Sequence, residues 1–533
     1  MTDLLITGGL VADGTGSPLR RADIAVSDGR ITGVGTVAGP AARVIDATDR
    51  VVCPGFIDLH SHSDLALLGN PAAHSKIRQG VTTEVVGNCG LGAAPLIADV
   101  DRAALRAAIA FIDVDPGLRW TWQGFADYLD VLARARPSVN VVTLVAHLPL
   151  RAGVVGFADR PATPAELSRM CGHLAEALDA GAAGLSTGLV YAPLCYAAED
   201  ELTALARVVA AHDRIFAWHV RDYGDDLLES VRQALRVARS SGCRVQISHL
   251  AAVGRRNWGK VAAALTMIDE ARAGGARVTA DVYPYLAGSA NLSQLLPAWA
   301  HAGGGSAMTA RLADPAVRQR IRREWADAFW SWDDIMVGSV PESGDREAAG
   351  RTIAELTAER GQSGDDVVMD LVAAYGNAVS MVAFGRSEDD LRTALRHPAV
   401  AIGSDGFALD PDGVGGEGVP HPRSYGCYPR LLARYAGSSE LTLEDAVHKS
   451  SGLPAELYGL TDRGVLRPGA AADLVVLDPG TIGDRATFTD PHRFPAGIEV
   501  VMVNGALAVT GGTHTSARTG MVLRAHGQIG ARP

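Results

Sequence analysis

Short apolar runs that alternate with helix-like segments fill the middle of the chain, and this alternation constrains the fold more than any other feature. The helix signals between the runs include Thr163-Pro164-Ala165-Glu166, a capping box with proline at the first helical position. Strands that alternate with helices predict a parallel sheet, and eight of them predict a closed (β/α)8 TIM barrel of the α/β class. The eight runs are residues 51–57, 81–86, 141–145, 184–186, 215–218, 245–248, 278–280 and 400–403.

The two ends of the chain follow a different pattern, in which short β runs are joined by tight turns. Asp28-Gly29 and Asn504-Gly505 each separate two such runs, which is a hairpin signal. We expect residues 1–54 and 466–533 to form one small β-sandwich domain together, and the barrel to span residues 55–465. Residues from about 290 to 380 break the alternation, and we interpret them as an insertion between the seventh and eighth strands.

Charge and composition exclude several kinds of partner. The 533-residue chain has a net charge of −11 and no clustered Lys/Arg tract, which argues against nucleic-acid and membrane-surface binding. The N-terminus lacks the basic region of a signal peptide, and no apolar run reaches transmembrane length, so we expect a cytoplasmic protein. Six scattered cysteines do not form a disulfide scaffold, and reduced thiols are expected. The oligomeric state, monomer or homodimer, stays open.

Potential metal ligands follow the ends of several predicted strands. His60 and His62 come after the first run, Cys89 after the second, and His219 and His249 after the fifth and sixth. Alternation along a strand points the first two histidines to the same side. One histidine after a strand is more often a structural residue, but the C-terminal ends of barrel strands all face one cavity. The joint placement of four histidines and a cysteine therefore predicts a zinc site.

An acidic residue completes this pattern. Asp405, in Gly403-Ser404-Asp405-Gly406, ends the eighth predicted strand and should stand beside the first strand where the barrel closes. A carboxylate in that place can take a proton from an attacking water and deliver it to a leaving nitrogen. The alternative is a structural aspartate in a Ser-Asp-Gly turn.

These residues resemble the amidohydrolase superfamily and, within it, the D-aminoacylase (N-acyl-D-amino-acid deacylase) family. The resemblance runs from about residue 3 to 510. Beyond the two histidines, it rests on Gly87-Asn88-Cys89-Gly90, Ser186-Thr187-Gly188-Leu189-Val190-Tyr191, Ser248-His249-Leu250, Asn257-Trp258-Gly259, Asp281-Val282-Tyr283-Pro284-Tyr285, Gly403-Ser404-Asp405-Gly406 and His421-Pro422-Arg423-Ser424-Tyr425-Gly426.

The resemblance implies a particular division of the ligands. Many superfamily members bridge two metals with a carboxylated lysine on strand four, but this chain has no lysine near residues 184–188, and Cys89 resembles the family's substitute. One tightly held zinc is then implied on Cys89, His219 and His249. His60, His62 and Asp405 lie beside it as candidates for a second, weaker position.

The resemblance also implies contacts to the substrate. Arg423, Tyr283 and Ser289 are candidates for holding a substrate α-carboxylate, because a planar guanidinium suits that group, although an ordinary surface arginine is the alternative. Tyr191 is a candidate for lining the pocket. The chain departs from the family at Ala251, where members commonly have a lysine, and this difference predicts an altered pocket.

The expected function is zinc-dependent hydrolysis of the amide bond of N-acyl amino acids, N-acyl-D-amino acids above all, with Asp405 as the proton shuttle. An amidohydrolase that cleaves another amide, such as a dipeptide, a cyclic ureide or an aminoacyl group of a specialised metabolite, is the alternative. A non-catalytic scaffold barrel is a third hypothesis. The presence of all five ligands together with the aspartate disfavours it.

Overall fold

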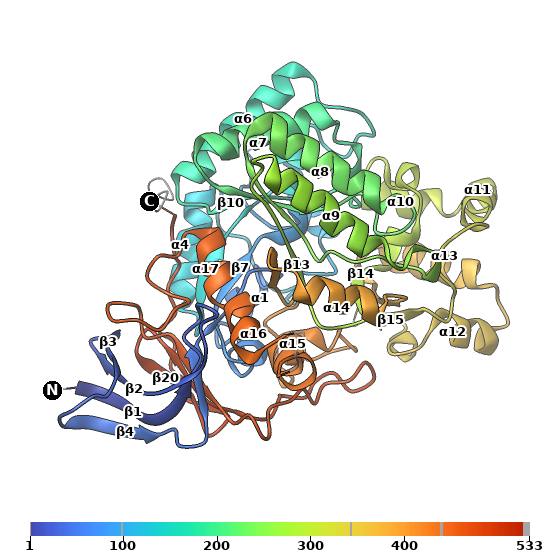
Figure 1. The fold of residues 1–533 in the computed structure, drawn as a ribbon. Helices are drawn as coiled ribbons and strands as arrows, with labels where there is room; N and C mark the ends of the chain where they lie inside the picture. Colours follow the sequence, from blue (N-terminus) through green and yellow to red (C-terminus); the bar gives the residue numbers. More distant parts are fainter. Residues whose placement is uncertain (1, 98–99, 342–343, 438–440, 526–533) are drawn as a thin grey trace.

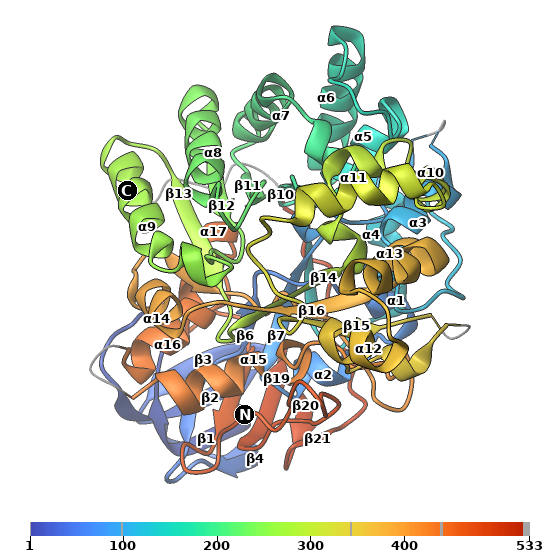
Figure 2. The same cartoon turned by 90° about the vertical axis from the view of Figure 1, so that its right-hand side faces the viewer.

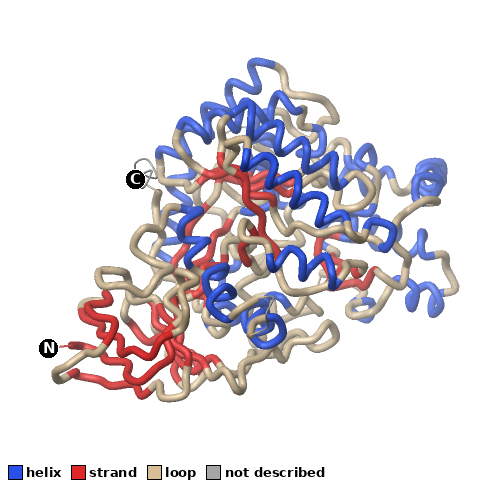
Figure 3. Tube along the Cα trace, in the orientation of Figure 1, coloured by secondary structure: helices blue, strands red, loops and turns tan. Residues whose placement is uncertain are grey.

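The computed structural model describes residues 2–97, 100–341, 344–437 and 441–525. Its strands form a central barrel, a separate β-domain that contains the N-terminal strands, and a third unit on the far side of the barrel (Figure 1). Helices surround the barrel strands, whereas the β-domain consists of strands and loops (Figure 3). Within the described residues, no helix combines the length and apolar character needed to cross a membrane.

The barrel is built from two parallel sheets that meet at both edges. Leu144 N–H donates to the Val86 carbonyl at 2.9 Å and links the sheets at the third strand, which this residue divides into two short pieces. A parallel bridge between Ser61 and Gly406 joins the first and eighth strands. The predicted α/β barrel is therefore confirmed. Its strands are β6 (Phe56–Asp58), β7 (Val81–Val86), β8 (Asn140–Thr143), β9 (Val145–Ala146), β10 (Gly184–Gly188), β11 (Ile215–His219), β12 (Arg244–Ile247), β13 (Val278–Val282) and β17 (Val400–Ile402).

The helices follow the strands along the chain, as the α/β pattern requires. Thr163 caps the helix over Pro164–Asp179 through the predicted capping box with Glu166. The main barrel helices are α4 (Phe125–Ala135), α5 (His147–Val154), α6 (Pro164–Asp179), α7 (Glu199–Ala211), α8 (Leu227–Ser241), α9 (Lys260–Ala273), α14 (Glu388–Arg396), α15 (Arg423–Arg430), α16 (Leu443–Ser450) and α17 (Gly452–Tyr458).

The prediction of a single first strand over residues 51–57 is wrong. β5 (Val51–Pro54) pairs with β1 (Thr2–Val11) and β18 (Leu474–Leu477) in the β-domain, and only β6 enters the barrel. The break falls at Gly55, where any Cβ would clash with the Thr82 side chain. The apolar run is continuous because both short strands are buried, so hydrophobicity alone does not reveal the division.

Both ends of the chain contribute to the β-domain, as predicted. The Asp28-Gly29 and Asn504-Gly505 turns have positive φ angles at both residues (50° and 72°, 49° and 84°), as a two-residue hairpin turn requires. Nine strands form its continuous sheet: β1, β2 (Arg20–Ser27), β3 (Arg30–Gly35), β4 (Ala41–Asp46), β5, β18, β19 (Ile498–Val503), β20 (Ala506–Thr510) and β21 (Thr513–His514).

The insertion between β13 and β17 has a sheet and a hydrophobic core of its own. Its antiparallel strands β14 (Ala287–Asn291), β16 (Ser380–Phe384) and β15 (Ile335–Ser339) lie in that order, and Figure 2 views them from the side of the insertion. The accompanying helices are α10 (Gly305–Arg311), α11 (Pro315–Trp325), α12 (Ile353–Arg360) and α13 (Gly364–Tyr375).

A buried lysine joins three strand ends where the barrel closes. Lys76 Nζ lies 2.6 Å from an Asp58 carboxylate oxygen, 2.6 Å from Ser404 Oγ and 3.5 Å from a Glu84 carboxylate oxygen. Burial alone would lower the pKa of this lysine, but the Asp58 and Glu84 carboxylates raise it overall. The ammonium group is therefore charged, and it compensates two carboxylates that water does not reach.

Replacing this cation should destabilise the fold. Lys76→Met leaves Asp58 and Glu84 buried without a counter-charge, so we expect a loss of about 3–5 kcal/mol in the free energy of unfolding. Chemical denaturation monitored by circular dichroism measures it. Arg207→Met, on the exposed side of α7, is the control and should change stability little. Equal stability of the two variants would contradict the role of the lysine.

Candidate metal centre

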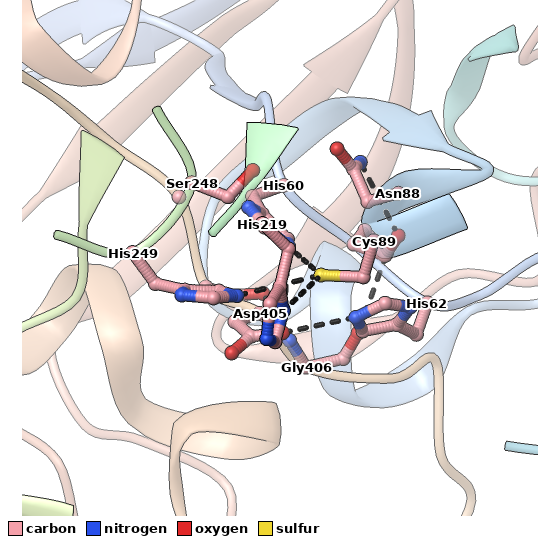
Figure 4. Close-up of polar contacts among 12 residues, drawn as sticks. His60, His62, Asn88, Cys89, His219, Ser248, His249, Asp405 and Gly406 are labelled. Atoms are coloured by element: carbon pink, nitrogen blue, oxygen red, sulfur yellow. Dashed lines mark hydrogen bonds and ion pairs between the residues drawn. The ribbon is translucent and has the colours of Figure 1, made fainter. Parts of the chain in front are cut away.

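The sulfur of Cys89 lies at the centre of a group of histidine nitrogens (Figure 4). Its Sγ atom is 3.2 Å from His60 Nε2, 3.4 Å from His219 Nδ1 and 3.4 Å from His249 Nε2. His62 Nε2 lies 3.0 Å from the nearer carboxylate oxygen of Asp405.

These side chains form two groups of potential ligands that share Cys89. One group holds Cys89, His219 and His249, and the other holds His60, His62, Cys89 and Asp405, with the ligand atoms of each group within 4.8 Å of one another. All of these residues are buried. The structure therefore brings the predicted ligands together in two groups, a Cys-His-His group and a second group beside it.

The barrel strands place the ligands at their C-terminal ends. His219 is the last residue of β11, and His249 follows β12 by two residues. Cys89 lies in a short turn after β7, where the Asn88 side-chain amide donates to the Val85 carbonyl at 2.9 Å. Cys89, His249 and Asp405 have φ angles of 54°, 35° and 54°, which are unfavourable for residues with a Cβ atom. Such strain is common at functional sites.

The protonation of these groups fits a bound cation. Burial lowers the pKa of His219 to about 3, so its ring is neutral and keeps a lone pair for a metal. Burial raises the pKa of Cys89 to about 11, whereas a metal-free nucleophilic cysteine needs a lowered value. A metal ion would remove this proton on binding. His62 Nδ1 and His219 Nε2 are buried without hydrogen-bond partners among the described residues. Thiolate with imidazole is a donor set that suits Zn²⁺.

Asp281 orients two of the histidines, a contact that the sequence pattern did not reveal. It lies in β13 and is fully buried. One carboxylate oxygen accepts the backbone N–H of His249 at 2.9 Å, and the other lies 3.3 Å from His60 Nδ1 and accepts from the Gln246 amide at 2.6 Å. A carboxylate behind a ligand fixes the ring orientation of that ligand. The sequence signals were its place in a strand that ends at the site and its membership of the Asp281-Val282-Tyr283-Pro284-Tyr285 motif.

Asp405 stands beside the first barrel strand, as predicted. Its backbone N–H donates to the His60 carbonyl at 2.7 Å, and its second carboxylate oxygen forms an ion pair with Arg423 Nη1 at 2.7 Å. Burial alone would raise the pKa of Asp405, but the Arg423 charge and the neighbouring histidines hold it well below its usual value. The carboxylate is therefore ionised and able to accept a proton.

A cavity of about 1350 Å³ opens above these groups. Every site residue predicted from the sequence lines it except His60, which is fully buried. Arg386, which had no predicted role, also lines it. The predicted residues on its wall are Cys89, His62, His219, His249, Asp405, Tyr191, Tyr283, Ser289 and Arg423. Ala251 is buried.

The sequence is similar to amidohydrolases over most of its length. The model of the amidohydrolase family matches residues 43–509. N-acyl-D-glutamate deacylase of Alcaligenes xylosoxydans xylosoxydans is 39% identical over 100% of this chain and 98% of its own length. D-aminoacylase of the same organism is 37% identical over 98% of this chain and 97% of its own.

Solved structures of deacylases have the same fold as this chain. N-acyl-D-glutamate deacylase from Bordetella bronchiseptica, crystallised with zinc and a phosphonate inhibitor that mimics the tetrahedral intermediate, superposes with a TM-score of 0.83 at 35% identity, covering 98% of this chain and 100% of that one. The chain therefore belongs to the amidohydrolase family and, within it, to the D-aminoacylase (N-acyl-D-amino-acid deacylase) family.

Removal of the shared sulfur tests the ligand groups. Cys89→Ala should retain little zinc, because both groups lose a donor at once. Elemental analysis of the dialysed protein measures the metal content. Cys195→Ala removes another thiol of the same cavity, one outside both groups, and should leave the zinc in place. A full zinc complement in Cys89→Ala would refute the proposed ligands.

Proposed function

We propose that this protein is a zinc-dependent hydrolase of N-acyl amino acids that prefers the D enantiomers. The observation that carries the proposal is the Cys89-centred pair of ligand groups on the wall of a large cavity, with an ionised carboxylate beside them. The preference for D substrates rests on likeness to relatives named for N-acyl-D-glutamate and D-amino-acid deacylation.

The ligand groups define where zinc would be held. Cys89, His219 and His249 would hold the tight ion, and His60, His62 and Asp405 offer a weaker position that shares the sulfur. Bound zinc supplies Lewis acidity, which polarises an amide carbonyl and makes water a better nucleophile at neutral pH. The buried walls keep bulk water from these charges and so strengthen the electrostatic interactions.

Asp405 supplies the proton transfer. Its carboxylate accepts a proton from the attacking water and then passes it to the leaving nitrogen, so the amide releases a carboxylic acid and a free amino acid. The hydrogen bond with His62 and the ion pair with Arg423 hold both oxygens in place. The low pKa keeps the base ionised at neutral pH before each turnover.

A substrate screen tests the reaction and its handedness. We expect hydrolysis of N-acetyl-D-amino acids to exceed that of the L enantiomers, and activity to fall when a chelator removes zinc and to return when zinc is added. Release of free amine measures turnover, and elemental analysis of the same samples gives the metal content. Dipeptides and cyclic ureides belong in the screen, because turnover of those alone would overturn the proposal.

A second test separates the base from the metal site. Asp405→Asn should lower kcat by about 10²- to 10⁴-fold, because the amide cannot accept the proton. Its zinc content should stay close to that of the wild type if Cys89, His219 and His249 hold the tight ion. Asp115→Asn, at another acid of the cavity wall, should keep normal kcat. Near-normal turnover of Asp405→Asn would refute the proton-shuttle role.

A further inference from the structure

We infer that Tyr223 is a positioning residue that fixes His219 and His249 as a pair of metal ligands, an inference that rests on the zinc position of the proposed function. Tyr223 lies in the loop between β11 and α8 and lines the cavity. It is not a candidate ligand itself, and no motif in the sequence pointed to it.

The ring of Tyr223 packs against both imidazoles. Its centre lies 5.0 Å from the centre of the His219 ring, edge to face at 88°, and 5.2 Å from the centre of the His249 ring. The two imidazoles also contact each other, with centres 4.6 Å apart. Edge-to-face contacts between rings are favourable and directional, so Tyr223 limits how far either imidazole can turn.

The hydroxyl of Tyr223 joins the ends of two neighbouring barrel strands, β11 and β12. It accepts the backbone N–H of Val220 at 3.2 Å and donates to the carbonyl of Ser248 at 3.2 Å. Val220 directly follows His219, and Ser248 directly precedes His249. One hydroxyl therefore connects the main chain beside the two ligands.

Each of these peptide groups is also held at its other end. The His219 carbonyl, which shares a peptide group with the Val220 N–H, accepts the N–H of Leu189 at 3.1 Å. The N–H of His249, which shares a peptide group with the Ser248 carbonyl, donates to Asp281 at 2.9 Å. Because a peptide group is planar, hydrogen bonds at its two ends fix the orientation of the whole plane.

The backbone of His249 shows why this support is needed. Its φ angle of 35° is unfavourable for a residue with a Cβ atom. Such a conformation persists only where the surrounding contacts over-determine it, and Asp281 and Tyr223 supply those contacts on the peptide plane that precedes His249. Without the hydroxyl, this plane can turn and carry the imidazole away from Cys89, whose Sγ atom now lies 3.4 Å from His249 Nε2.

The loop that carries Tyr223 is itself well fixed. A carboxylate oxygen of Asp222 accepts the backbone N–H groups of Gly224 and Asp226, at 2.6 and 3.0 Å. The carbonyl of Tyr223 accepts the N–H of Val253, in the loop after β12, at 2.8 Å. Tyr223 is therefore held on both sides and can act as a rigid support for the two histidines.

The hydroxyl of Tyr223 has no proton to offer to a substrate. A hydroxyl carries one hydrogen, and this one is directed to the Ser248 carbonyl, while the oxygen accepts the Val220 N–H. Its place on the cavity wall thus reflects the support of the ligands, and Tyr223 acts through His219 and His249.

The test removes the hydroxyl and keeps the ring. Tyr223→Phe should raise the dissociation constant for zinc at least about fivefold, as expected for loss of hydrogen bonds that orient metal ligands. Tyr223→Leu, which also removes the ring contacts, should raise it further. Competition with a chromophoric chelator measures the constant, and denaturation of the metal-free proteins shows that each variant is folded.

Tyr196→Phe is the matched control, because the Tyr196 hydroxyl also donates to a main-chain carbonyl, that of Ala298 at 2.7 Å, and contacts neither ligand group. It should leave the dissociation constant for zinc unchanged. An unchanged constant in Tyr223→Phe, or an equal rise in Tyr196→Phe, would overturn the inference.

Cobalt in place of zinc separates positioning of the ligands from a general loss of stability. The visible absorption bands of bound Co²⁺ depend on the geometry of its ligands. We expect the bands of Tyr223→Phe to differ from those of the wild type, and the bands of Tyr196→Phe to coincide with them. Coincident bands in all three proteins would overturn the inference even where the affinity falls.

Turnover in the substrate screen tests the proposed function separately. A wild type that binds zinc and hydrolyses none of the compounds would overturn the proposed function, and the zinc affinities and cobalt spectra would still decide the role of Tyr223. A wild type that binds no zinc would overturn both.

Discussion

The site depends on how the barrel closes between its first and eighth strands. Lys76, buried between Asp58 and Glu84 and bonded to Ser404, neutralises the carboxylates at this closure and ties β6, β7 and β17 together. His60 and His62 follow the first of these strands, and Asp405 follows the last, so one compensated cluster sets the distance between these candidate ligands and the proposed base. Charges of this kind are stable in a barrel interior only when they are paired.

The sequence allowed prediction of the barrel and of the potential metal donors that gather at its rim, because strand ends and donor residue types are local signals. A histidine directly after a buried strand must face the C-terminal rim, whichever residues surround it. The division at Gly55 could not be predicted, because both flanking strands are buried and read as one apolar run. β5 belongs to the β-domain in part because it pairs with β18, more than four hundred residues away, whereas β6 pairs with β7 of the barrel.

The residues that sequence reasoning missed act through contacts between distant segments. Asp281 carries a charge that looks ordinary in its own segment, and its contact with His60 depends on a residue that another strand supplies. Arg423 lines the cavity, and its ion pair with Asp405 was not foreseen from the sequence. Pairing between charges is a property of tertiary structure, so residue type alone could not reveal that the Arg423 guanidinium is ion-paired.

The insertion has its own core, yet β14 and β16 deliver Ser289 and Arg386 to the cavity wall, whereas the barrel strands deliver every candidate metal ligand. The two sets of side chains thus belong to separately packed units. Substitutions within the insertion can therefore alter which molecules are accepted while the candidate zinc ligands keep their geometry. Exchange of this unit between family members offers a route to new substrate ranges on an unchanged hydrolytic centre.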